Sequence, residues 1–240
     1  MRRLFLIICI FCSGSYFQPI SAVELSEILK RYDRAHGGFT LDQETRSIRI
    51  RGEMEQQGET FEFVLYKRAP RSMRFECRQT SGSSFIVYNG KEAWFWNETE
   101  PESAKQLKGD ALATVEQEAY FGGWLDWARS EGMGLELVEA SGPSAEIPNQ
   151  PFKIRATSRN GDVVGVVSLA PQSFLEIERA LFVLREGAPV VTKFRDYREV
   201  NGFPVPHLVE SFVGEELVAK TVVSEVAPNV GLLSLYFERP

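Results

Sequence analysis

The sequence predicts an α+β protein: one large curved antiparallel sheet of roughly a dozen strands, with helices on its concave face. Two observations predict this class. Apolar and polar residues alternate with period two through most of the chain beyond residue 45, and Asn-Gly pairs separate several of the alternating runs. Helical spacing occurs only at the start and in the middle. Because a curved sheet must cover its apolar face, we expect the helices to lie there.

The first 22 residues have the pattern of a secretory signal peptide. Arg2 and Arg3 precede an apolar run at 4–11 that is too short to span a bilayer, and a small-residue cleavage site ends at Ala22. We therefore expect export, cleavage after about Ala22, and a single domain over residues 23–240.

The expected mature chain is acidic. Removal of the signal leaves 25 basic and 33 acidic residues, a formal charge of −8, which argues against nucleic acid as a partner. The signal also takes away Cys9 and Cys12, so Cys77 has no cysteine to pair with. Cys77 lies on an apolar strand face and is expected to be a small core residue.

The first half of the mature chain is expected to begin with a helix and continue as strands. An amphipathic helix over 23–36 ends at Gly37-Gly38, and Asn89-Gly90 predicts a tight two-residue hairpin turn. On the strand after this turn, Trp94 and Trp96 share one face. The alternating strand segments in this half are 48–54, 61–65, 73–78, 85–88 and 93–97.

The middle of the chain, residues 101–132, lacks alternation and predicts two short helices on either side of Gly122-Gly123. We expect these helices to form a displaceable lid, with Gly122-Gly123 as its hinge. After them the strands resume, with hairpin turns at Asn160-Gly161 and Asn201-Gly202. The expected strands lie near 135–140, 152–158, 163–169, 174–184, 190–200, 205–213 and 217–226.

Sequence motifs for catalysis or metal binding are absent. His36 is placed at a helix end and His207 on a strand, and neither has Cys or carboxylate neighbours at metal-binding spacing. The sequence has no GxSxG elbow, P-loop or GxGxxG motif. We therefore expect no catalytic residue, no metal and no cofactor, and hence no enzyme.

Residues 61–100 resemble the periplasmic lipoprotein-carrier family, LolA, and its relatives, the outer-membrane lipoprotein-sorting proteins. The likeness continues in "FRDYREVNGFPVPHLVES" (194–211) and in the closing "LYFERP". The residues that carry the first stretch are Lys67, Arg68, Pro70, Arg74, Phe75, Asn89, Gly90, Lys91, Trp94 and Trp96.

The resemblance implies a half-barrel of about 11 strands whose concave face is covered by helices. The same resemblance implies a soluble, monomeric periplasmic carrier or chaperone whose lidded groove binds lipid or lipoprotein acyl chains. It also implies contacts with inner- or outer-membrane transport proteins. A family arginine that controls the lid corresponds to Arg68 when the basic pair is aligned, whereas alignment on Pro70 puts Ala69 there. The alternatives are a lipoprotein-sensing module of the RseB-like kind, which contacts a membrane protein, and a hydrolase. The cargo class, lipoprotein or free lipid or glycolipid, stays open.

We expect two sets of apolar residues to form the site. Both sets are equally suited to plain packing of the sheet against its helices. The cavity set is Ile48, Ile50, Phe61, Phe63, Leu65, Met73, Phe75, Trp94 and Trp96, and the lid set is Leu112, Val115, Phe121, Trp124 and Trp127.

Overall fold

The structure is a computed structural model that describes residues 24–36, 45–80, 82–138, 141–144, 146–182 and 188–239. The predicted signal peptide, its cleavage site and the helix stop at Gly37-Gly38 lie outside these residues. In the described ranges, none of the helices has both the length and the apolar character needed to cross a membrane.

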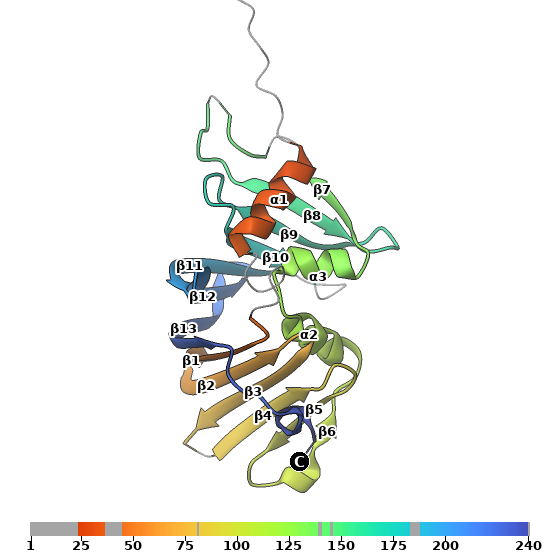
Figure 1. The fold of residues 1–240 in the computed structure, drawn as a ribbon, viewed down its shortest axis with the longest axis vertical. Helices are drawn as coiled ribbons and strands as arrows, with labels where there is room; N and C mark the ends of the chain where they lie inside the picture. Colours follow the sequence, from red (N-terminus) through yellow and green to blue (C-terminus); the bar gives the residue numbers. More distant parts are fainter. Residues whose placement is uncertain are drawn as a thin grey trace, which may run out of the picture.

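Thirteen strands form one open antiparallel sheet (Figure 1), which confirms the predicted fold class. The order is β6-β5-β4-β3-β2-β1-β13-β12-β11-β10-β9-β8-β7. The count exceeds the predicted 11 partly because β6 has only two residues, too few for alternation to be visible. The strands are β1 Ser47–Gln56, β2 Glu59–Arg68, β3 Ser72–Gln79, β4 Gly82–Tyr88, β5 Ala93–Asn97, β6 Lys105–Gln106, β7 Gly134–Leu137, β8 Phe152–Thr157, β9 Val163–Leu169, β10 Glu176–Leu181, β11 Val190–Val200, β12 Phe203–Val213 and β13 Glu216–Pro228.

Three α-helices cover one face of this sheet, called the inner face here. Helix α1 (Leu25–His36) and helix α3 (Trp124–Ser130) pack on β7–β9, while α2 (Gly109–Ala119) packs on β3–β5. Cross-strand pairing places both contact areas on the same side, because paired residues can be followed from β2 through β1, β13 and β12 to β11 past the β-bulges in these strands. Figure 1 shows the resulting two-part arrangement, with β1 and β11–β13 between the helix-covered ends.

Each helix-covered end has its own apolar core. Under α1 and α3 the fully buried side chains include Ile28, Tyr32 and Leu125, packed against Ile154 and Leu169 of the sheet. Under α2, the smaller core consists of Met73, Tyr88, Ala93, Val115 and Ala119. The first core therefore holds its helices with far more buried apolar area than the second holds α2.

The opposite, outer face of β2–β5 carries a third cluster. Trp96 packs there with Val87 and with Phe237, which belongs to a short 3-10 helix, η2 (Ser234–Phe237), near the C-terminus. Trp94 is packed against the same cluster. Figure 1 shows this C-terminal segment running across the strands of that end. The two tryptophans share one face, as predicted, but this face lies away from the helices.

The Asn-Gly pairs differ in the turns they form. Val200 pairs with Phe203, so Asn201-Gly202 is a two-residue turn with positive φ at both positions, as predicted. The Asn89-Gly90 prediction is wrong in length: Tyr88 pairs with Ala93, which leaves a four-residue loop. The Asn89 side chain accepts hydrogen bonds from the amides of residues 91 and 92, and this favours the longer loop.

Candidate functional site

A cavity of about 190 Å³ lies on the inner face, between the two helix-covered ends. Its floor is formed by Ile48 and Ile50 of β1, and its roof by Phe121 and the two glycines that join α2 to α3. Val205 and the flanking prolines of β12 close another side. The lining is mainly apolar, so the cavity is suited to a nonpolar occupant.

The linker above the cavity is held at defined points. The amide of Phe121 donates to the carbonyl of Pro70, in the turn between β2 and β3, at 3.1 Å. Gly123 lies so close to α1 that a Cβ there would be 2.0 Å from the Tyr32 hydroxyl. Its φ of −74° is open to any residue, so glycine is needed at this position for close packing rather than for hinge motion.

We call α2, α3 and the linker between them the cover of the cavity. Arg71, in the turn between β2 and β3, contacts this cover near the ends of both helices. Its guanidinium donates to Ser130, the last residue of α3, at 3.2 Å and to Glu131, which follows it, at 2.7 Å. The same group lies over the ring of Tyr120 at the end of α2. Arg71 thus connects the end of α2 to the end of α3. The predicted candidate, Arg68, lies on the outer face.

The contacts of Arg68 are all with the C-terminal segment. Its guanidinium donates to the carbonyl of Leu232 and lies 4.7 Å from the centre of the Phe237 ring. The reason is strand parity: Arg68 has the opposite orientation to Leu65 and Lys67, which point to the inner face. The structure thus places Arg68 beside the C-terminal segment, on the face opposite to the helices.

Two polar side chains line the cavity. Burial lowers the pKa of Lys67 from its ordinary value to about 8, with Glu118 opposing and Arg179 adding to this shift. Burial likewise lowers the pKa of His36 to about 4, although the Tyr32 carbonyl beside its Nδ1 opposes the shift. At neutral pH the cavity therefore holds a lysine that is still mostly charged and a neutral imidazole.

Further along the inner face, a buried ion pair joins Glu176 and Arg179 of β10 at 2.9 Å. Burial raises the pKa of Glu176, and Arg179 partly offsets this effect. The guanidinium also lies 5.0 Å from the centre of the Phe194 ring. Because the two opposite charges offset each other, the pair adds little net charge to the inner face.

The predicted cavity residues divide between the two faces. Ile48 and Ile50 line the cavity, and Trp94 and Trp96 lie on the outer face. The remaining members point to the inner face from β2 and β3. They are Phe61, Phe63, Leu65, Met73 and Phe75. Two tryptophans on β5 looked like groove residues only because the sequence does not reveal which face of a strand its helices cover.

The predicted lid residues also fall into two groups. Leu112 and Val115 of α2 pack on β3–β5, whereas Trp124 and Trp127 of α3 belong to the larger core with α1. Phe121, between the helices, lines the cavity. Arg129 of α3 is also ion-paired with Asp33 of α1. Helix α3 is therefore fixed to α1, and α2 is the more weakly held part of the cover.

Sequence reasoning missed Lys67, Arg71 and the proline-flanked Val205 as site residues. For Lys67 a signal existed, because it continues the inward parity of Phe63 and Leu65. No comparable signal existed for Arg71 or Val205, since both act across contacts between distant segments. Cys77 is buried, as predicted for a small core residue, and is a free cysteine among the described residues.

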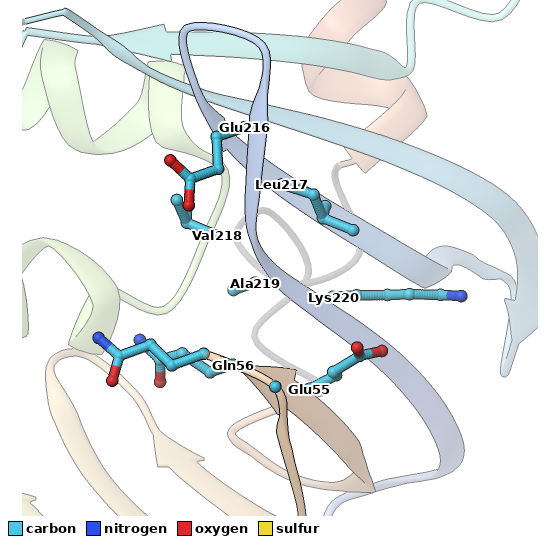
Figure 2. A pocket seen from close by; sticks show the side chains of 9 residues that line it. Glu55, Gln56, Glu216, Leu217, Val218, Ala219 and Lys220 are labelled. Atoms are coloured by element: carbon cyan, nitrogen blue, oxygen red, sulfur yellow. The ribbon is translucent and has the colours of Figure 1, made fainter.

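A larger, open hollow of about 520 Å³ lies at the ends of β1 and β13 (Figure 2). Figure 2 shows Glu55, Glu216 and Lys220 among its lining side chains. This charged and solvent-facing wall is less suited to an apolar chain than the cavity under the linker. Within the described part of the chain, no group of three or more His, Cys, Asp or Glu side chains could hold a metal ion.

Comparisons with known proteins reveal similarity in fold. No protein-family model and no curated protein matches the chain. Among solved structures, a LolA superfamily protein from Nitrosomonas europaea aligns with a TM-score of 0.62 at 11% identity, covering 90% of this chain and 98% of that one. A domain described as an outer membrane lipoprotein-sorting protein, from Vibrio parahaemolyticus, aligns at 0.59 and 10%, covering 88% and 94%.

A DUF1329 family protein from Desulfovibrio piger also aligns, with a TM-score of 0.59, 13% identity and coverage of 88% and 97%. At these identities the similarity establishes the architecture. The chain therefore has the LolA-type fold, as the sequence resemblance predicted.

Proposed function

We propose that this protein is a periplasmic carrier or chaperone that binds the acyl chains of lipids or lipoproteins on the inner face of its sheet. The observation that supports the proposal best is the apolar cavity beneath a two-part helical cover, in a fold shared with LolA superfamily proteins. The inner-face aromatic and aliphatic side chains of β1–β3 continue the apolar surface away from this cavity.

The size of the cavity requires the cover to move. An apolar cavity of about 150 Å³ holds one benzene molecule, so 190 Å³ takes only the first part of a long chain. Helix α2 is the element to be displaced, because its core is small and no ion pair joins it to α1 or α3 among the described residues. The cover thus shields the groove when it is empty.

Displacement of α2 also makes release possible. Burial of an acyl chain contributes about 0.8 kcal/mol per methylene, so two or three chains in a rigid open groove would bind too tightly to be delivered. When α2 is displaced, its own apolar contacts are lost. The net free energy of cargo binding is then the burial free energy of the acyl chain minus that of the lost α2 contacts.

The test compares a cavity-filling variant with a matched outer-face variant. Ile50→Trp fills the cavity, whereas Val222→Trp adds the same side chain at an exposed outer-face position of β13. Each protein is purified without detergent, titrated with a neutral fluorescent acyl ester, and examined by native mass spectrometry after exposure to a diacylated lipopeptide. We expect Ile50→Trp alone to weaken binding. Equal binding by both variants, or co-purification of a protein partner in place of lipid, would favour the sensing alternative.

A further inference from the structure

Lys67 is an unpartnered cation in an apolar setting. It points to the inner face from the end of β2 and lines the cavity with Ile48, Ile50 and Phe121. In the described ranges, its ammonium group makes no hydrogen bond and no ion pair within 4.0 Å. Lys67 is half-buried, and an ammonium group among apolar side chains without a protein partner is incompletely solvated, so the site is electrostatically complementary to an anion.

The charged groups around Lys67 limit the kind of anion. From α2, exposed Glu118 attracts the ammonium group and would repel an anion, while Arg179 of β10 does the reverse but is already paired with Glu176. His36, at the end of α1, is neutral at pH 7. The site thus offers the single positive charge of Lys67, with the negative carboxylate of Glu118 nearby. It is better matched to a ligand with one negative charge than to a phosphate with two.

We propose that the cavity binds the carboxylate of a long-chain fatty acid, with Lys67 as its counter-ion. This inference rests on the proposed function, since the same groove must take the acyl chain. The carboxylate lies under the Phe121 linker, and the chain follows the apolar inner-face row of Ile50, Leu65 and Phe63. A charge-assisted hydrogen bond from Lys67 then distinguishes a free acid from an esterified chain.

The experiment uses cis-parinaric acid and its methyl ester, two fluorescent probes that share one chain and differ in charge. The full mature protein is titrated with each at pH 7, together with Lys67→Met and the control Lys220→Met, which removes a lysine at the hollow shown in Figure 2. We expect wild type and Lys220→Met to bind the acid about tenfold more tightly than the ester. Lys67→Met should lose this preference and bind the acid and the ester about equally.

A pH series on the wild-type protein provides a second readout that needs no variant. The carboxylate is ionised throughout pH 7–9.5, so only the lysine changes charge. Because the pKa of Lys67 is about 8, the preference for the acid should be constant below pH 8 and decline above it. Preference for the acid that persists in Lys67→Met, or that is absent from wild type, overturns the inference and leaves the proposed function intact.

Two further outcomes separate the remaining possibilities. If neither probe binds the wild-type protein, the proposed function fails and the inference fails with it. If lysophosphatidic acid displaces cis-parinaric acid at lower concentration than oleic acid does, a phosphate is the preferred group, and the assignment to a carboxylate is overturned.

Discussion

Removal of the Arg71 guanidinium should make ligand binding tighter. In the closed cover this group is ion-paired with Glu131 at 2.7 Å, and the two side chains are 33% and 38% exposed. Such a partly solvated pair contributes about 0.5 kcal/mol, and the contact with the Tyr120 ring about 0.5 kcal/mol more. Arg71→Ala should therefore destabilise the closed cover by about 1 kcal/mol.

This free energy acts directly on affinity when the ligand must displace the cover. A loss of about 1 kcal/mol from the closed state corresponds to about fivefold tighter binding of a neutral acyl ester. The assay is a fluorescence titration of wild type, Arg71→Ala and Arg78→Ala, with thermal unfolding of each to verify the fold. Arg78 is a suitable control because it lies near the far end of β3, 54% exposed, beside Glu76. Unchanged or weaker binding by a folded Arg71→Ala protein would refute the displaceable cover.

Three other perturbations test separate parts of the structure. Because the pKa of His36 is about 4 in the fold and 6.5 when unfolded, its stabilising effect is complete above pH 6.5 and should fall by about 2 kcal/mol at pH 5. Urea unfolding should detect this loss, and His36→Asn should lack it. Phe237→Ala should cost about 3 kcal/mol of stability but leave the affinity for the acyl ester unchanged, since the side chain is on the outer face. Gly52→Ala would bring a Cβ to 2.1 Å from the Val222 carbonyl oxygen and should lower the melting temperature; Gly231→Ala, with open space around it, should not.

Local sequence patterns were sufficient for much of the architecture. Alternation located nearly all of the strands, with β11 predicted to the residue, and helical spacing located α1, α2 and α3. These predictions succeed because side-chain periodicity is set by the backbone geometry of each element. The Asn201-Gly202 turn was predicted for the same local reason, since both residues tolerate positive φ.

The errors concern relations between segments that are distant in the chain. Trp94 and Trp96 were assigned to the groove, yet η2 returns to cover them on the outer face, about 140 residues later in the sequence. Arg68 was considered for lid control, but parity turns it toward this same segment. Both errors have one cause: alternation divides a strand into two faces without indicating which elements will cover each face.

The sequence by itself determined a long antiparallel sheet with three helices, because period and turn chemistry are properties of short segments. Only the tertiary structure decided which residues of each strand point to the helix-covered face, that α3 is fixed to α1 while α2 is held more weakly, and that Lys67 faces a cavity with no ion-pair partner in the described part of the chain. These features arise from packing between segments far apart in the chain. Such packing depends on the register and coverage of the whole sheet, which no local pattern encodes.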